Sequence, residues 1–304
     1  MHTPFNFPNL HTLGALLGTL LFSALSVTAS AGTIEKIRAS NTIVLAHREA
    51  SIPFAYYDDN KKPIGYAIDL CMNVVNAIKR ELKLPTLKVE WIPVTGSTRI
   101  PTIVEGKADL ECGSTTNNME RRKLVGFTIP HFISASRFVV RSASPFKTID
   151  DLQGKNVVST KGTTNLKTLV AQNEVRVLHM NIIEAKDHAE AFAMVATGKA
   201  DAFAMDDVLL YGLRANAASP RDFKVIGDAM TVEPYSIMLR KDDLAFKKIV
   251  DREVSRTITS LEINALCKKW FESPIPPKGI NLELKIPFLL RDSFQFPSDS
   301  LPEL

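Results

Sequence analysis

The chain of 304 residues carries 37 basic and 33 acidic residues, a formal net charge of +4 at pH 7, and 45% of its residues are hydrophobic. The positive excess is too small and too evenly scattered for a nucleic-acid-binding surface, and the apolar content is that of a globular chain. About 270 residues beyond an N-terminal leader exceed one ordinary core and indicate two units of about 100–150 residues.

Residues 1–31 are predicted to be a secretory signal peptide. Residues 13–27 form an uncharged, mostly apolar stretch, and the sequence ASA at 29–31 supplies the small residues of a cleavage site before Gly32. A transmembrane helix would need about 20 such residues, which makes anchoring the weaker interpretation. The segment before residue 13 has no Lys or Arg, which departs from the usual signal-peptide pattern. We expect export.

The next part of the chain alternates predicted strands and helices. Apolar residues recur every four positions from Leu70 to Leu82, which predicts an amphipathic helix, and alternate with other residues from Leu87 to Trp91, which predicts a strand. In chain order we predict a strand over 42–46, a helix over 68–84, a strand over 87–91 and a helix over 99–104.

One phrase occurs twice, as IVEGKADLECGST at 103–115 and as MVATGKADAFAMD at 194–206. Each copy runs from a helical tail into a short apolar strand, and Gly106 and Gly198 lie where a helix C-cap needs positive φ. The copies are about 92 residues apart, beyond the roughly 20–50 of a solenoid repeat, and indicate two similar α/β lobes. Ligands bind outside the carboxyl ends of the strands in such sheets, which predicts a cleft between the lobes.

Polar residues follow both strands of the repeat. Ser114, Thr115 and Thr116 follow the first strand, and Asp206 ends the second. A helix is predicted to begin after Thr116, with Asn117 as its N-cap and Glu120 at position N3. This would place Arg121 in the first helical turn, beside the strand exit.

The second lobe is predicted to contain strands over 156–159 and 176–180 and helices over 165–172, 188–197 and 207–217. The first of these helices opens with the sequence GTT at 162–164, whose free N–H groups suit an anion. Strands over 137–141 and 235–240 would carry the chain out and back as a two-stranded hinge. The tail from 274 onward is predicted to be an extended strap on the surface.

Three cysteines, an odd number for an exported protein, allow at most one disulfide. Cys112 lies in a predicted buried strand and Cys71 on the apolar face of a predicted helix, which favours buried free thiols for these positions. The spacing of Cys71, Cys112 and Cys267 matches no zinc site. We predict no metal and no cofactor.

Several segments together resemble the periplasmic amino-acid-binding proteins of ABC importers, solute-binding protein family 3, and among them the glutamate- and aspartate-binding members. They cover the mature chain in the family's order. The segments are HRE at 47–49, IPFAYYDDNKKPIGYAIDL at 52–70, RIP at 99–101, ECGSTTNNMERR at 111–122, GTT at 162–164, AKDHAEAF at 185–192, FAMDD at 203–207 and MLRKDD at 238–243.

The resemblance implies a type II periplasmic-binding-protein fold, with two α/β lobes joined by a two-stranded hinge and one small-ligand site between them. It also implies a periplasmic location, a monomer, and an ABC importer membrane permease as partner. On this basis the predicted parts are a signal peptide over 1–31, a first lobe over 32–139 and 235–273, a second lobe over 140–234, and a C-terminal extended segment over 274–304.

The resemblance also implies how the backbone of a free amino acid is bound. The planar guanidinium of Arg121 would form a bidentate pair with the α-carboxylate, and Asp206 would accept hydrogen bonds from the α-ammonium. Alternatively, Arg121 is a solvated helix charge and Asp206 an N-cap. Further hydroxyl and backbone donors would come from Ser114, Thr116, Thr163 and Thr164.

Arg48, Arg99 and His188 match positions where the acidic-amino-acid members place positive donors. Two arginines that converge on one pocket repel each other unless an anion separates them, which implies a second carboxylate and therefore L-glutamate or L-aspartate. The alternatives are an edge charge for Arg48, a surface residue for Arg99 and a helix start for His188.

Two departures from the family pattern affect these expectations. Gly96 stands where the acidic-ligand members have a serine, so one hydroxyl contact would be absent or taken by Ser97. Ser236 and Ile237 replace a cysteine of the return strand, so Cys112 cannot pair there. The choice between glutamate and aspartate stays open.

Two other functional classes remain as alternatives. The cyclohexadienyl dehydratases are enzymes with the same fold, but their catalysis needs a general acid or base. The candidate cleft residues here are mostly donors, so we predict no enzymatic activity. A sensory ectodomain is the second alternative, and would require a membrane helix or a fused domain.

Overall fold

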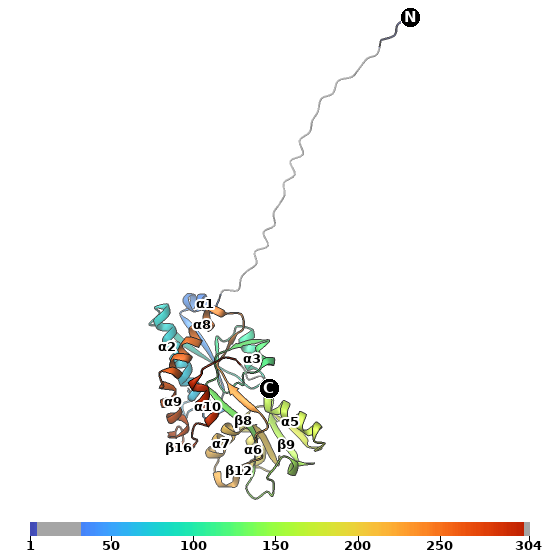
Figure 1. Ribbon diagram of the computed structural model, residues 1–304, viewed down its shortest axis with the longest axis vertical. Coiled ribbons are helices and arrows are strands. Elements are labelled where there is room, and N and C mark those ends of the chain that lie inside the picture. Colours follow the sequence, from blue (N-terminus) through green and yellow to red (C-terminus); the bar gives the residue numbers. More distant parts are fainter. Residues whose placement is uncertain (5–31, 301–304) are drawn as a thin grey trace. The chain divides into compact units, whose positions relative to one another are not determined.

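Two β-sheets with helices packed around them organise the protein (Figure 1). The computed structural model describes residues 1–4 and 32–300. All but the first four residues of the predicted signal peptide therefore lie outside the described part of the chain. Among the described helices, none combines the length and the apolar character that crossing a bilayer requires.

The first sheet is built from strands at both ends of the described chain. Its order is β5 (Lys88–Pro93), β1 (Thr42–His47), β6 (Leu110–Cys112), β14 (Met238–Arg240) and β7 (Val125–Phe127). β1 pairs parallel with β5 and β6, whereas β14 is antiparallel to β6 and β7. The helices of this part are α1 (Thr33–Ser40), α2 (Tyr66–Leu82), α3 (Arg99–Val104), α4 (Met119–Arg122), α8 (Leu244–Thr259) and α9 (Glu262–Phe271), and a small sheet holds β2 (Ala50–Ser51), β3 (Ala55–Tyr57) and β4 (Pro63–Ile64).

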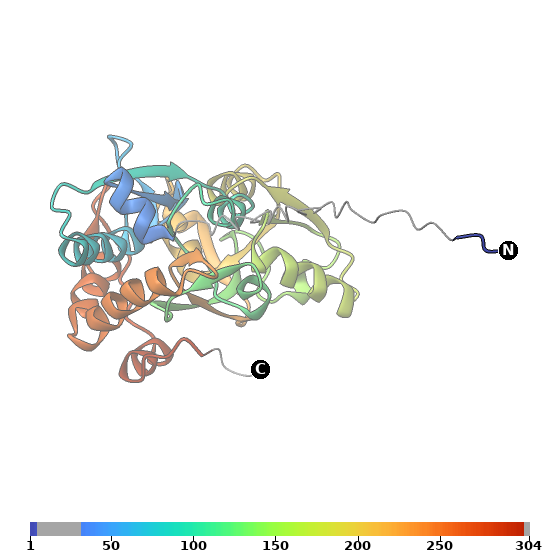
Figure 2. The same cartoon turned by 90° about the horizontal axis from the view of Figure 1, so that it is seen from above.

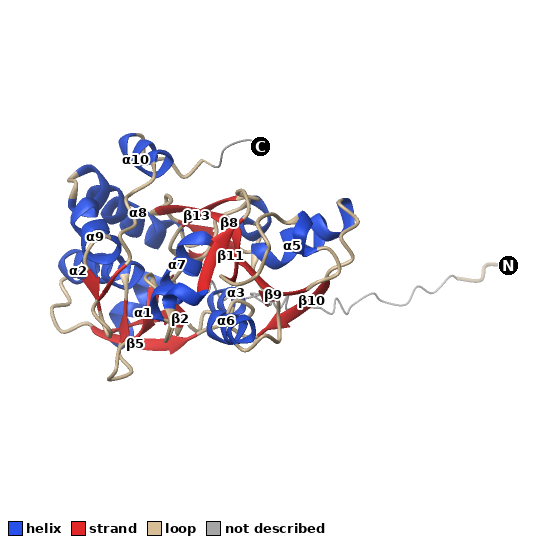
Figure 3. Cartoon of the chain, turned by 90° about the horizontal axis from the view of Figure 1, so that it is seen from below, coloured by secondary structure: helices blue, strands red, loops and turns tan. Residues whose placement is uncertain are grey.

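The second sheet comes from one continuous stretch of chain. Its order is β10 (Asn181–Ala185), β9 (Asn156–Thr160), β11 (Ala202–Asp206), β8 (Phe132–Arg141) and β12 (Phe223–Ile226), and β13 (Val232–Tyr235) also pairs with β8. The helices are α5 (Thr164–Val175), α6 (His188–Ala196) and α7 (Asp207–Asn216), with 3₁₀ turns η1 (Asp150–Leu152) and η2 (Pro220–Asp222). α5 and α6 pack on β9 and β11, and α7 packs on β8 (Figure 3).

The chain passes between the two sheets through β8 and β13. These strands pair antiparallel, with Phe132 opposite Tyr235 and Ala135 opposite Val232. The hinge strands therefore begin earlier than the predicted 137–141, and the predicted return strand over 235–240 is divided into β13 and β14. The division follows from hydrogen bonding, because Ser236 N between them donates to Thr115 O at 3.1 Å.

The repeated phrase has the local structure that the sequence predicts. Gly106 and Gly198, with φ of +68° and +78°, follow α3 and α6 and lead into β6 and β11. The predicted helices over 68–84, 99–104, 165–172, 188–197 and 207–217 correspond to α2, α3, α5, α6 and α7 within a few residues.

Two local predictions are wrong. Residues 176–180 are not a strand, because Arg176 caps the end of α5 and the chain turns back with positive φ at Val177 and His179 before β10 begins. The N-cap of α4 is Asn118, whose side chain accepts from Arg121 N, whereas Asn117 donates to Ser236 Oγ at 3.2 Å. Arg121 nevertheless lies in the first turn.

The C-terminal tail contains more regular structure than the predicted extended strap. β15 (Pro274–Ile275) and β16 (Ile280–Asn281) pair with each other, and α10 (Phe288–Gln295) follows. α10 lies on the outside of the protein and contacts α8 and β8 (Figure 2). Burial of Leu290 explains why the segment folds there as an amphipathic helix.

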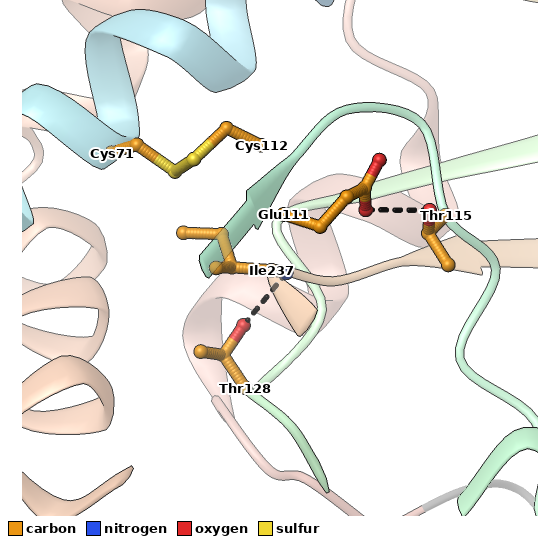
Figure 4. Close-up of a disulfide and its surroundings, with 6 residues drawn as sticks. All are labelled: Cys71, Glu111, Cys112, Thr115, Thr128 and Ile237. Atoms are coloured by element: carbon orange, nitrogen blue, oxygen red, sulfur yellow. Dashed lines mark hydrogen bonds between the residues drawn. A yellow bond between two sulfur atoms is a disulfide. The ribbon is translucent and has the colours of Figure 1, made fainter. Parts of the chain in front are cut away.

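The favoured interpretation of buried free thiols is wrong for two of the three cysteines. Cys71 of α2 and Cys112 of β6 form a disulfide (Figure 4). Their Cα atoms lie 6.2 Å apart because the apolar face of α2 packs on this sheet, a proximity that periodicity does not reveal. Cys267 is a buried free thiol, whose pKa burial raises to about 12.

We expect the disulfide to stabilise the fold by restricting the unfolded chain. It joins residues separated by 41 positions, and a loop of this size corresponds to about 2–4 kcal/mol. Replacement of both Cys71 and Cys112 by Ala should lower the free energy of unfolding by about this amount, measured by urea denaturation. Dithiothreitol should lower the stability of the wild type but leave the double variant unchanged. Equal stability of the two proteins without reductant would contradict the expectation.

Candidate functional site

Side chains from both sheets line one small cavity. The space between them, open solvent at its mouth included, is about 200 Å³. Of the residues that the sequence predicts for the site, all except Arg121 line this cavity. The lining residues are Arg48, Arg99, Ser114, Thr116, Thr163, Thr164, Asn165, His188, Met205, Asp206 and Leu209.

Two buried arginines supply hydrogen-bond donors to the cavity. Arg99, the first residue of α3, donates to Thr115 Oγ1 at 2.7 Å and to Ser114 O at 3.3 Å. Arg48, directly after β1, donates to His188 Nε2 at 3.3 Å. Nη1 of Arg48, Nε of Arg99 and Oγ of Ser114 are buried without a hydrogen-bond partner among the described residues. Unpaired buried donors are costly, so this group of atoms suits an anionic ligand group.

His188 differs from the predicted positive donor. Its pKa is held well below the usual range by burial and by the positive charges of Arg48 and Arg99, so its ring is neutral at pH 7. Because Nε2 accepts from Arg48, Nδ1 carries the proton and donates to Thr160 Oγ1, 2.8 Å away. His188 thus orients Arg48 across the cavity, and the positive charge comes from arginines.

Asp206 carries the carboxylate of the cavity. Its Oδ1 accepts from Asn165 at 2.8 Å, and its Oδ2 accepts from the hydroxyl of Tyr235. Burial raises the pKa of Asp206 to about 7, and the negative charge of Glu233 adds to the effect. Asp206 occupies the N-cap position of α7, yet within the described structure its side chain makes no capping hydrogen bond. The carboxylate is therefore not used as a helix cap.

The hydroxyls of Thr116 and Thr164 do not point their protons toward the cavity, although the sequence predicts them as donors to the ligand. Thr116 Oγ1 and Thr164 Oγ1 both donate to Glu233 Oε2, at 2.6 and 2.8 Å. A hydroxyl has one proton, so these oxygens can only accept from a ligand. Thr163 Oγ1 donates to Thr160 O and accepts from Leu166 N, which makes it the side-chain cap of α5.

Arg121 lies beside the cavity without lining it. Its side chain is 8% exposed, and it donates to Thr116 O at 2.9 Å and to Gly162 O at 3.4 Å. Burial and the nearby Arg99 lower the pKa of Arg121 to about 9, against the negative charges of Glu233 and Asp206. The guanidinium therefore connects the loops that follow β6 and β9.

Glycines allow the segment between β5 and α3 to approach the loop after β9 closely. A Cβ on Gly96 would lie 2.5 Å from Lys161 O, and one on Gly162, whose φ is +76°, would lie 2.6 Å from the Gly96 backbone. A serine at 96 therefore does not fit this arrangement, which gives a physical reason for the departure at this position.

At the rim, Lys167 and Glu120 form an ion pair at 2.6 Å between α5 and α4. These contacts connect the two lobes.

Sequence reasoning missed four buried polar residues of the site. Glu111 accepts from Thr115 Oγ1 at 2.6 Å and adds negative charge near the arginines (Figure 4). Asp206 accepts from Asn165 and Tyr235, and Glu233 accepts from the two threonines, Thr116 and Thr164. The available signal was a glutamate two residues before the predicted return strand of the hinge, where a surface charge is the ordinary interpretation. Among the described residues, no cluster of His, Cys, Asp and Glu could hold a metal ion.

Comparison with known proteins identifies the family. The sequence profile of the bacterial extracellular solute-binding proteins, family 3, matches residues 43–273. The chain belongs to this family. The L-glutamate/L-aspartate-binding protein of Pseudomonas aeruginosa is 46% identical over 290 residues, which cover 95% of this chain and 96% of the relative. The glutamate/aspartate import solute-binding protein of Escherichia coli is 41% identical and covers 89% of this chain and 90% of its own.

A solved structure of ArgBP from T. maritima superposes with a TM-score of 0.69, at 24% identity, over 78% of this chain and 98% of the other. This similarity confirms the type II periplasmic-binding-protein fold. The relatives from Pseudomonas aeruginosa and Escherichia coli are both named as binding proteins, and the second as an import solute-binding protein. The comparisons thus favour the binding protein over the dehydratase alternative.

The raised pKa of Asp206 predicts a specific pH dependence of stability. Between its usual value of 3.8 and about 7, the folded protein retains a proton that the unfolded chain has released. The contribution of this group to stability is therefore greatest below pH 4 and is lost as the pH rises to about 7. The wild-type free energy of unfolding, minus that of Asp206→Asn, should fall by up to about 4 kcal/mol across this window.

Urea denaturation of both proteins from pH 4 to pH 8 measures this difference. The subtraction removes the titration of groups elsewhere. The charged groups that face Asp206 are Glu233, Asp207, Arg99 and Arg121, and Asn165 and Tyr235 donate to it. Parallel stability curves would show that Asp206 does not titrate in this range.

Proposed function

We propose that this protein captures L-glutamate or L-aspartate in the cavity between its lobes and delivers the amino acid to an ABC importer permease. The observation that carries the proposal is the pair of buried arginines, Arg48 and Arg99, whose unpaired donors meet Ser114 Oγ at the same cavity. Such a donor set fits a carboxylate, and the Asp206 carboxylate in the same cavity fits an ammonium. The names of the relatives from Pseudomonas and Escherichia agree with this choice.

Each end of the ligand has a set of partners in this proposal. Arg48, Arg99 and Ser114 bind the distal carboxylate. Asp206 pairs with the α-ammonium, which also donates to the oxygens of Thr116 and Thr164. The N–H groups at the start of α5 and the Thr163 backbone bind the α-carboxylate, and this proposal requires the guanidinium of Arg121 to turn from Thr116 O and Gly162 O toward it. His188 contributes by orienting Arg48.

The proposed cellular setting is the periplasm, where the protein acts as a monomer. The lobes over 32–139 with 235–273 and over 140–234 close on the ligand, and the tail from 274 packs outside them. A charged ligand shared between the lobes stabilises the closed arrangement because it pairs buried groups of opposite charge.

A calorimetric titration of ligand-stripped protein with a panel of amino acids tests the function directly. L-Glutamate or L-aspartate should bind one to one, whereas arginine, lysine and leucine should give no heat of binding. A cationic side chain would face Arg48 and Arg99, and an apolar one would leave their donors unpaired. Tight binding of lysine or arginine would overturn the assignment of the substrate.

Arg99 should select the distal carboxylate rather than the amino-acid backbone. Removal of one partner from a buried ion pair costs about 3–5 kcal/mol, which is on the order of a hundredfold or more in affinity. Arg99→Ala should lower the affinity for glutamate by about this factor. It should lower the affinity for glutamine less, because the glutamine amide is neutral, so the ratio of the two affinities should fall. The exposed Arg176, which pairs with Asp150, provides Arg176→Ala as a control with the same loss of net charge. Equal weakening of glutamate and glutamine would remove Arg99 as a selector.

A further inference from the structure

Glu233 receives hydrogen bonds from both lobes on a single oxygen. It lies on β13, the return strand of the hinge, and its side chain is 2% exposed. Thr116, in the loop after β6, and Thr164, the first residue of α5, both donate to Glu233 Oε2. Thr231 donates to the other oxygen, Oε1, at 2.6 Å. Glu233 itself is not among the residues that line the cavity.

The bond to Thr116 belongs to one rigid part of the protein. Asn117 N donates to Pro234 O at 2.7 Å, and Thr116 forms a backbone bridge with Tyr235. The loop over 115–117 is thereby fixed to the return strand of the hinge. Glu233 and Thr116 consequently keep their distance when the lobes move apart.

The bond to Thr164 joins the return strand of the hinge, to which the loop over 115–117 of the first lobe is fixed, to α5 of the second lobe. Thr164 begins α5, which packs on β9 and β11 of the second sheet. Its hydroxyl oxygen lies 3.5 Å from that of Thr116, so both hydroxyls reach the same carboxylate oxygen only when the lobes are together. Displacement of α5 by a few ångströms would break this bond, which is of the stronger kind because the acceptor is charged.

We propose that Glu233 is a closure latch, a positioning residue that holds the two lobes together through Thr164 and turns the Thr116 and Thr164 oxygens toward the ligand ammonium. This inference rests on the proposed function for the identity of the ligand. The carboxylate accepts a hydrogen bond from each hydroxyl, so each threonine presents only acceptor lone pairs to the cavity. Glu233 acts through these two residues and not by contact with the ligand.

The latch predicts a change in the rate of ligand release. Glu233→Ala and Thr164→Val should each raise the dissociation rate of L-glutamate by about ten- to a hundredfold, the value of a hydrogen bond to a charged group. The association rate should stay within about threefold, because the open protein lacks the bond. Glu233→Gln keeps an acceptor oxygen and should recover part of the loss. Stopped-flow fluorescence with L-glutamate, and with L-aspartate as second ligand, measures both rates.

Thr231→Val is the matched control. It removes a hydrogen bond to the same carboxylate that does not cross between the lobes, so its dissociation rate should stay within about threefold of the wild type. The double variant Glu233→Ala/Thr164→Val should release ligand more slowly than the product of the two single effects predicts, since the bond between Glu233 and Thr164 is lost in both single variants. A role in stability alone would lower the melting temperature without this non-additivity.

The failure of the latch can be told apart from failure of the function. If the wild type binds neither glutamate nor aspartate, the proposed function is wrong. The latch is then judged with the amino acid of the same panel that does bind, whose dissociation rate Glu233→Ala and Thr164→Val should raise and Thr231→Val should leave within about threefold of the wild type. If the wild type binds but the variants release at its rate, or if the two changes add, the latch is overturned. Should Glu233→Ala not fold, Thr164→Val and Glu233→Gln give the same decision.

Discussion

The burial of charge between the lobes is the constraint on which the site depends. Arg48, Arg99 and Arg121 are buried close to the acidic side chains of Glu111, Asp206 and Glu233. A buried charge is tolerated only where opposite charges and hydrogen bonds compensate for lost hydration. The compensation is partial, because burial still lowers the pKa of Arg48 and Arg121 and raises that of Asp206. Polar groups that stay unpaired then become the places where a charged ligand gains most.

The fold delivers these charges through the ends of its strands. β6 and β11, the two strands of the repeated phrase, end at opposite walls of one cavity. The return strand of the hinge then binds the loop after β6 through backbone hydrogen bonds. The return strand of the hinge and the loop over 115–117 are thus held together. Glycines at 96 and 162 allow close backbone contact between the lobes.

The same site illustrates why residue type does not determine chemical role. Histidine near two arginines becomes a neutral acceptor, because burial and like charge both oppose protonation. Threonine near a buried glutamate becomes an acceptor toward the ligand, because its only proton is already donated. Asp206 stands at the start of α7 but does not cap it, because its carboxylate accepts hydrogen bonds from Asn165 and Tyr235 instead. In each case the neighbour across the cavity decides the role.

The sequence by itself determined most of the local elements and pointed to most of the residues that line the cavity. Apolar periodicity located α2 and α3, and the repeated glycines marked the ends of α3 and α6, because these features depend on neighbours within a few positions. The positions of Arg48, Arg99, Ser114 and Asp206 followed from the resemblance to the family. Only the tertiary structure decided the pairing of Cys71 with Cys112, the place of Glu233 and the direction of the threonine protons. Those properties depend on contacts between segments far apart in the chain, and neither spacing nor composition carries information about which buried groups will meet.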